Sequence, residues 1–405
     1  MNNVRSDAMK QKPFYRRIGL LGYIFLAILS GIATGWAAPE WLVRVFVTFN
    51  GLFSQFLGFV IPLLIVGLVA PAIVEIGKGA GKMLLFTVGL AYTATILAGL
   101  FSYFTGVTFF PSMIQPDRYV EAMGESVRLV PYFTVEIAPV MTVTTALVLA
   151  FVLGLCVARF AISTALRDVL VDFREVIVMV IKSVIVPLLP LYIFGIFSDM
   201  TFTGQVAGIM GTFIKVIGVI FVMHVLLLIF QYLAGGWIGR RNPLRCMKLI
   251  LPAYFTALGT SSSAATIPVT LRQTKAMGVD PAVADFTVPL CATIHLSGST
   301  LKIVACALAL MILQGHSYDF PMFMGFIAML GITMIAAPGV PGGAVMSALG
   351  VMTSILGFSD ADNALMIALY IAMDSFGTAC NVSGDGALAL IVNRVFGKKP
   401  AHCAN

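Results

Sequence analysis

Four polar residues, Asp374, Thr378, Asn381 and Asp385, lie within a long apolar run at 361–393. A helix turns by about 100° per residue, so this spacing places all four side chains on one helix face. A bare carboxylate in lipid costs at least about 2.5–3.5 kcal/mol, and two acids without a nearby Lys or Arg repel each other. The face therefore suits an ammonium group and a small cation. A structural polar seam between packed helices is the alternative interpretation.

The string NVSGDG at 381–386 adds a second argument for a cation site. Gly384 and Gly386 permit the helix to unwind, and free backbone carbonyls together with Asp385 would form an oxygen cage for a hard cation. The alternative is a simple glycine kink in a continuous helix.

Other polar breaks occur in the second half of the chain. TSSSAAT at 260–266 offers hydroxyls and free amides, which can hold a substrate carboxylate at the start of a half-helix. GVPGG at 339–343 could do the same from the opposite side and act as a gate. His295 interrupts a third apolar run and could carry a proton or serve as a structural hydrogen-bonding residue. Lys302, further along the same run, could pair with a carboxylate or extend to the membrane surface.

The composition indicates that lipid is the main solvent for these segments. Of 405 residues, 59% are hydrophobic and 11% are charged, against about 45–50% and about 25% in soluble domains. This excludes a soluble enzyme. The net charge of +7 comes largely from Lys and Arg in short loops, so membrane orientation explains it better than nucleic acid does. The six Cys are scattered, which disfavours a disulfide framework.

Apolar runs and loop charges together predict the topology of the chain. Basic loops alternate with loops poor in cations, which places both termini in the cytoplasm and requires an even number of spans. The basic segment 1–17 is expected to be a cytoplasmic tail, not a cleaved signal peptide. The expected spans lie near 18–37, 46–74, 83–106, 139–161, 176–198, 206–236, 280–313 and 361–393.

Two further segments, 248–271 and 322–357, are too polar or too rich in Gly and Pro for ordinary spans. The loop charges place both ends of each segment on one side of the membrane, and the two segments enter from opposite faces. The sequence therefore predicts an all-α membrane protein with about eight spans and two re-entrant helical hairpins. This inverted-repeat arrangement is typical of secondary transporters, whose sites lie near the middle of the membrane.

Four motifs in this order resemble the dicarboxylate/amino acid:cation symporter family, which includes the glutamate transporter homologues, and are nearest to its bacterial serine/threonine transporter branch. The motifs are SSSAATIPVT at 261–270, PLCATIHLSGST at 289–300, GVPGG at 339–343 and MDSFGTACNVSGD at 373–385.

The resemblance implies a transporter and not an enzyme, located in a bacterial inner membrane as an obligate homotrimer. It also implies an elevator mechanism, in which a transport domain moves against a trimerising scaffold. No nucleic-acid partner is expected. The implied division is a scaffold at 18–82 and 107–198, a transport domain at 83–106 and 206–396, and cytoplasmic tails at 1–17 and 397–405.

The family's substrate site carries over residue by residue. Asp374 matches the acid that binds the substrate amino group, Asn381 the amide that holds the substrate backbone, and Thr378 a hydroxyl beside the side-chain pocket. The first hairpin's carboxylate-binding serines match Ser262 and Ser263, and the tip of the gate hairpin includes Val340 and Gly342.

Two departures from the family pattern bear on the substrate. Members that carry acidic substrates place Arg at the position of Gly377, and some place Arg at the position of Ser261. Without either cation, the pocket has no evident partner for a second carboxylate. The substrate is therefore expected to be a neutral amino acid such as serine, threonine or alanine. Gly377 could instead leave room for a larger side chain.

Ion coupling also departs from the family pattern. The resemblance implies Na⁺ as the coupling ion, with Asn381, Asp385, His295 and Cys291 as candidate ligands. The family string Asn-Met-Asp-Gly-Thr reads His-Leu-Ser-Gly-Ser at 295–299, however, which removes an amide and an acid. Fewer sodium ions, or a proton carried through His295, are both open.

Three other functions remain as alternatives. A dicarboxylate or acidic amino acid symporter, with protons as a second candidate for the coupling ion, is the nearest. A channel is the second. The third is an intramembrane serine hydrolase that uses Ser261 or Ser262 with His295 as its base, but this leaves Asp374 and Asp385 without a role.

Overall fold

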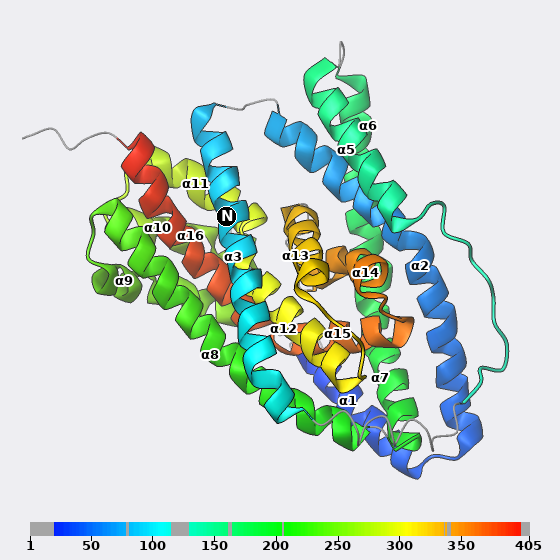
Figure 1. Cartoon of the computed structure of the whole chain (residues 1–405). Helices are drawn as coiled ribbons and strands as arrows, with labels where there is room; N and C mark the ends of the chain where they lie inside the picture. The colour runs from blue at the N-terminus through cyan, green and yellow to red at the C-terminus, as the bar shows by residue number, and fades with distance from the viewer. Residues whose placement is uncertain are drawn as a thin grey trace, which may run out of the picture.

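The computed structural model describes residues 20–77, 81–114, 129–160, 164–204, 206–335, 337 and 342–397, and the regular structure in these ranges is helical, without strands. Figure 1 shows the helices as a single packed assembly. In chain order they are α1 (Leu20–Ala37), α2 (Glu40–Gly77), α3 (Lys82–Met113), α5 (Val143–Phe160), α6 (Ala165–Val180), the π-helical η2 (Ile181–Ile185), α7 (Val186–Phe202), α8 (Val206–Gly239), α9 (Pro243–Thr260), α10 (Ser263–Ala276), α11 (Pro281–Ile294), α12 (Ser297–Leu313), α13 (Phe320–Ile335), α14 (Gly343–Leu356), α15 (Asp360–Ala372) and α16 (Asp374–Phe396).

Five helical segments within the described ranges are long and apolar enough to cross a membrane, and the bent pair α15–α16 makes up to six. The chain is therefore a membrane protein with several apolar helices. Shorter apolar stretches in α1 and α5 are the other two segments that the sequence analysis counts as spans. The five are Glu40–Val74, Lys82–Met113, Ala165–Phe202, Met210–Gly239 and Pro281–Leu313.

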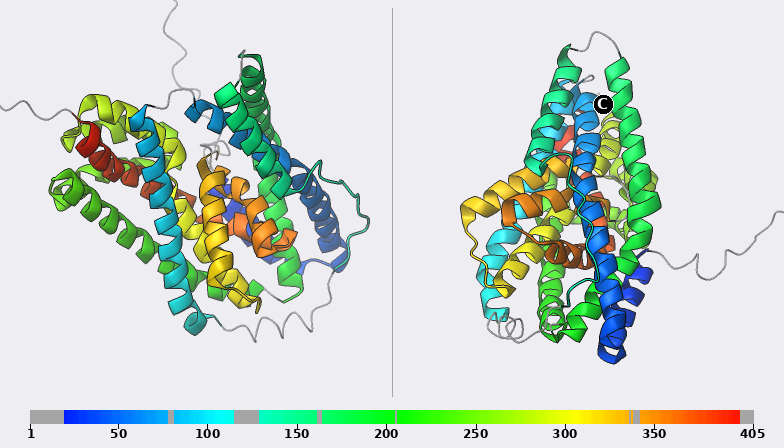
Figure 2. Two further views of the ribbon diagram at one scale, coloured as in Figure 1. Left: turned by 45° about the horizontal axis from the view of Figure 1, so that its top comes forward. Right: turned by 90° about the vertical axis from the view of Figure 1, so that its right-hand side faces the viewer.

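The helices pack in two groups (Figures 1 and 2). In the first, α2 packs against α5, α6 and α7, and α1 packs along α7. In the second, α16 packs against α8, α9, α10, α11 and α12, and α3 packs along α12. Contacts of α14 with α2 and of α15 with α1 and α7 join the groups.

Two antiparallel helix pairs correspond to the predicted hairpins. The first pair, α9 and α10, begins with Asn242 as N-cap and Pro243 as first residue, both favoured there because the first amides lack helical partners. It turns at Ser261 and Ser262. The second pair consists of α13 and α14. α14 begins directly after Gly342, whose φ of 76° suits glycine. Whether these pairs are re-entrant remains a prediction.

Two helical segments are broken within the second group. α11 ends at Ile294 and α12 starts at Ser297, so the chain is extended at His295, at the polar break that the sequence predicts. α15 and α16 meet at Met373 with a bend of 64°. α12 lies at the centre of the assembly, and all its residues are buried.

One expectation is wrong at α16. The helix is continuous from Asp374 to Phe396, so NVSGDG does not unwind and the break precedes Asp374. The glycines serve close packing instead. A Cβ at Gly384 would lie 2.5 Å from Cε1 of His295, and one at Gly386 would lie 2.8 Å from the Tyr232 hydroxyl.

Candidate functional site

A pocket that encloses about 400 Å³ of empty space, part of it open to solvent, lies where the tip between α9 and α10 meets α11, α12, α15 and α16. Six hydroxyl groups, one amide and one carboxylate line it together with four apolar residues, so among the described residues its lining holds one charged group. The lining residues are Ser261, Ser263, Ala292, Thr293, Leu296, Ser299, Ala337, Ala344, Tyr370, Asp374, Thr378 and Asn381.

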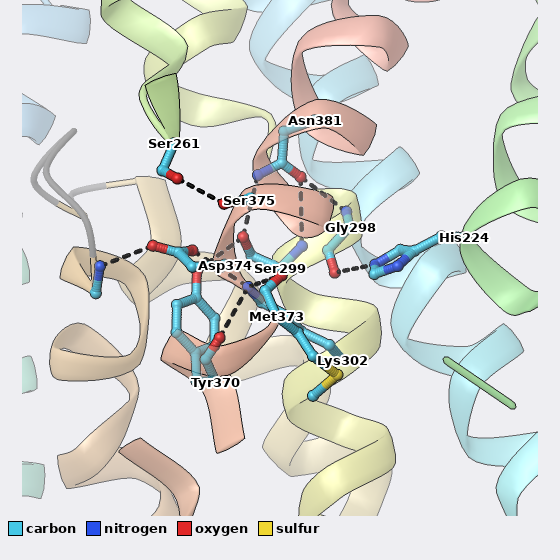
Figure 3. A network of polar contacts seen from close by, with 11 residues as sticks. His224, Ser261, Gly298, Ser299, Lys302, Tyr370, Met373, Asp374, Ser375 and Asn381 are labelled. Atoms are coloured by element: carbon cyan, nitrogen blue, oxygen red, sulfur yellow. Dashed lines mark hydrogen bonds and ion pairs between the residues drawn. The ribbon is translucent and has the colours of Figure 1, made fainter. Parts of the chain in front are cut away.

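Asp374 is the charged group, and both of its carboxylate oxygens have partners (Figure 3). Oδ2 accepts a hydrogen bond of 2.9 Å from the amide of Gly342, just before α14. Oδ1 lies 3.2 Å from Nζ of Lys302 on α12. Asp374 is the first residue of α16, where the positive end of the helix dipole favours an anion.

Lys302 is completely buried and reaches the break between α15 and α16. Its ammonium group also donates to the carbonyl oxygens of Tyr370 at 3.4 Å and Met373 at 3.3 Å. It lies 3.4 Å from the centroid of the Tyr370 ring, within reach of a cation–π interaction. Lys302 therefore caps the negative end of α15 while pairing with the first acid of α16.

Gly377 leaves the space that Lys302 occupies. A Cβ at Gly377 would lie 2.8 Å from Nζ and 2.9 Å from Cε of Lys302. The position where acidic-substrate relatives are expected to carry Arg thus faces a Lys from another helix. Because Asp374 already pairs with that Lys, the pair adds no net charge.

Asn381 lines the pocket and also caps α12. Leu296, which precedes α12, provides no capping side chain. The Asn381 side-chain oxygen instead accepts from the amides of Gly298 at 2.8 Å and Ser299 at 3.3 Å, and its nitrogen donates to the Ser299 hydroxyl at 3.0 Å. Figure 3 shows this network at the start of α12. Asn381 therefore satisfies amides that the helix start leaves without helical partners.

The three serines at the tip between α9 and α10 have different positions. Ser261 adopts a left-handed conformation, with φ of 49°, and its hydroxyl lies 2.7 Å from that of Ser375 on α16. Ser262 caps α10 by accepting from the amide of Ala265 at 3.3 Å. Of the two serines expected to bind a carboxylate, the structure places Ser263 in the pocket lining and Ser262 beside it as the cap.

A second polar cluster lies further along α16. Nδ1 of His295 is 2.9 Å from Oδ1 of Asp385, and both side chains are buried. Gln231 on α8 contacts Nε2 of His295 at 3.4 Å and donates to the Ser297 hydroxyl at 3.1 Å. Its own oxygen has no hydrogen-bond partner among the described residues. Asp385 and Asp374 share a face but belong to different clusters.

The other sequence-predicted residues have these positions. Thr378 lines the pocket beside Asp374. Cys291 is buried in α11, and its backbone carbonyl accepts from the amide of His295 at 2.8 Å. Val340 lies outside the described residues.

Sequence reasoning missed several members of these clusters. Gln231 carried a detectable signal, because it is a polar residue inside a long apolar helix. The roles of Tyr370, Ser299 and Ser375 had no such signal, because they depend on helices brought together from separate parts of the chain.

Comparisons with known proteins identify the family of the chain. A model of the sodium:dicarboxylate symporter family matches residues 20–395, so the chain belongs to that family. It is 28% identical over 392 residues to the serine/threonine transporter SstT of Acinetobacter baumannii, covering 92% of this chain and 96% of the relative. It is 26% identical over 410 residues to the serine/threonine transporter SstT of Streptococcus agalactiae, covering 95% and 98%.

The family and the names of these relatives indicate an amino acid symporter in a membrane, not an enzyme. The family resemblance that the four motifs carry is thereby confirmed.

Proposed function

We propose that this protein is a secondary active symporter that imports a neutral amino acid such as serine, threonine or alanine together with a cation. The observation that supports this substrate class best is the pocket's charge balance. Asp374, the one charged residue in the described part of its lining, is paired with Lys302, and hydroxyls and an amide supply the other polar groups there. A ligand with no net charge suits such a pocket.

The two ends of an amino acid have suitable partners across the pocket. The ammonium group binds Asp374 at the start of α16. The carboxylate binds the free amides at the start of α10 with the hydroxyls of Ser261 and Ser263, since a helix N-terminus favours an anion. A hydroxyl on the substrate side chain bonds to Thr378 or Ser299.

A dicarboxylate is the alternative substrate, and the family's description favours it. Its second carboxylate would enter a pocket whose described lining holds a carboxylate and no unpaired cation. Leaving that negative charge unpaired in a buried site is costly. The pocket chemistry therefore favours the neutral substrate.

Sodium is the first candidate for the coupling cation, as the family's description suggests. The Asp385 cluster is its candidate site, because a hard cation prefers oxygen ligands and Gln231 has a buried oxygen without a partner there. His295 bonds to Asp385 in the same cluster, which makes a proton the second candidate. The His295–Asp385 pair does not fix how many sodium ions accompany each substrate molecule.

The remaining architecture is proposed from the family and the sequence. We infer eight spans with α9–α10 and α13–α14 as re-entrant hairpins, and cytoplasmic termini in a bacterial inner membrane. The packing of α1, α2, α5, α6 and α7 together supports these helices as a scaffold, with the second group as the transport domain. A homotrimer that moves the transport domains as elevators follows from the same proposal.

A competition experiment tests the substrate class. The protein is reconstituted into liposomes, and uptake of labelled serine is measured with an excess of one unlabelled compound. Serine, threonine and alanine are expected to inhibit, while aspartate and malate have little effect. Inhibition by malate or aspartate without inhibition by threonine or alanine would contradict the proposal. Liposomes without protein provide the background.

A further inference from the structure

Lys302 is a buried cation that does not line the pocket, so the binding of a substrate does not by itself explain its presence. It pairs with Asp374 from α12, and its side chain has no exposed surface. Within the described residues it has four contacts at one point: a carboxylate, two helix-end carbonyls and a ring face. Figure 3 shows these groups around its ammonium group.

Asp374 is shared between this lysine and the pocket. One side of the carboxylate pairs with Lys302, and Asp374 also lines the space in which a ligand would sit. An amino acid brings an ammonium group of the same chemistry to the same carboxylate. Lys302 thus keeps Asp374 paired with a cation when the pocket is empty and no substrate ammonium group is present.

The charge matters most when the pocket is empty. A carrier that accumulates a substrate must return without it, and its site must then cross the membrane region with no ligand. An unpaired carboxylate in that region is costly, and breaking a buried ion pair by removing one partner is strongly destabilising. Because Lys302 stays paired with Asp374, the empty site does not carry an unpaired carboxylate through the membrane.

The position of Lys302 is specified by the surrounding helices. Gly377 provides the space for its end, and the carbonyls of Tyr370 and Met373 fix its ammonium group at the end of α15. These groups hold the lysine beside Asp374 independently of any ligand. A lysine that merely extended toward the membrane surface would make none of these contacts.

We propose that Lys302 is a built-in counter-cation that stands in for the substrate's ammonium group at Asp374 and lets the empty site return across the membrane. This rests on the proposed function as an amino acid carrier. It assigns Lys302 to the return step of transport and not to recognition of the substrate.

The test separates the return step from substrate binding. Lys302→Met and Lys302→Gln proteins are reconstituted, and two rates are measured with labelled serine: net uptake into empty liposomes, and exchange against unlabelled serine inside. Net uptake requires return of the empty site, whereas exchange does not. Net uptake is expected to fall about tenfold or more and exchange to stay within about threefold of the parent rate, because in these variants Asp374 has no cationic partner in the empty site, whereas the substrate's ammonium group pairs with it in the filled site.

Lys302→Arg keeps the charge and is expected to retain more net uptake than Lys302→Met. Lys215→Met is the matched control, since Lys215 lies on α8 away from the pocket and donates to the carbonyl of Met113. It should leave both rates unchanged. Monodisperse elution of each variant shows that it is folded, and the Gln variant retains hydrogen-bonding capacity if the Met variant does not fold.

Other outcomes overturn the inference. An equal loss of exchange and net uptake in folded protein would assign Lys302 to substrate binding. Unchanged rates in both assays would leave it only a packing role. The parent protein is assayed first. If it neither exchanges nor accumulates serine, threonine or alanine, the proposed function itself is refuted, and this result is separate from any result on the Lys302 variants.

Discussion

At the scale of single residues, the site depends on a lysine and a glycine from different helices. Lys302 reaches Asp374 only because Gly377 lacks a side chain. The sequence identifies Gly377 as a departure from the acidic-substrate pattern but does not identify what fills the space. The structure supplies that answer.

Gly377→Ala is therefore expected to disturb the ion pair. The new Cβ would lie 2.8 Å from Nζ of Lys302, so the buried ammonium group must shift from the position in which it pairs with Asp374. Overpacking of this kind typically costs about 1–3 kcal/mol, and we expect serine uptake per folded protein to fall about tenfold. Uptake in proteoliposomes and the thermal unfolding temperature measure the two effects.

Gly325→Ala is the matched control for this substitution. Gly325 lies within α13, and a Cβ there would meet no atom within 4 Å. Because Ala is favoured over Gly in helices by about 1 kcal/mol, the control should unfold at the same or a higher temperature and keep its uptake. Uptake by the Gly377 variant equal to that of the control would show that this contact is unimportant.

Spacing along the chain predicted part of the site at this scale. Asp374, Thr378 and Asn381 all line the pocket, as a shared helix face suggests. Asp385 shares the face but belongs to the His295 cluster, because eleven residues along a helix correspond to about 16 Å. A shared face thus identifies a direction, and the distance along the axis decides whether residues meet.

At the scale of elements, each broken helix is capped by a residue of the other. Asn381 of α16 caps the start of α12, and Lys302 of α12 caps the end of α15. Such caps satisfy backbone groups that a helix end leaves without partners. The breaks are stable because the two segments are packed together, with the pocket between them.

The sequence predicted two of the helix breaks but not the bend between α15 and α16. The break at His295 and the turn at Ser261 were predictable, because polar strings interrupt apolar runs there. The bend at Met373 was not, because it is stabilised by Lys302 from a distant segment. Gly384 and Gly386 suggested unwinding, but they lie where His295 and Tyr232 pack closely against α16. A glycine permits both outcomes, and the tertiary contact selects one.

At the scale of the whole molecule, α13 and α14, which the proposed division assigns to the transport domain, contact α2 of the proposed scaffold. A small cleft at this boundary is lined by Leu68 of α2, Thr333 of α13 and Ser347 of α14, among others. If the groups move against each other during transport, this boundary must slide. Relative motion of the groups is a consequence of the proposed elevator mechanism.

A covalent link across the boundary is therefore expected to stop transport. Leu68→Cys and Ser347→Cys are combined after the exposed Cys156 is changed to Ser. Treatment with a short bifunctional thiol reagent should abolish most serine uptake, and each protein that carries only one of the two new cysteines should be little affected. Full uptake by a protein shown by mass spectrometry to be cross-linked would contradict relative motion at this boundary.

A link within one group provides the control. Phe46 of α2 and Phe194 of α7 lie in contact, with their ring centroids 4.6 Å apart. Cysteines at these two positions would join helices of the proposed scaffold. Cross-linking them is expected to leave serine uptake unchanged.

The central claim, that the chain is a cation-coupled carrier of neutral amino acids, is tested most directly by accumulation of labelled serine in proteoliposomes. Uptake is compared between an inward sodium gradient, an inward proton gradient and no ion gradient. The account predicts accumulation above the external concentration with at least one gradient, sodium being the first candidate, and equilibration without a gradient. Serine uptake that never exceeds equilibration under either gradient would contradict coupled transport.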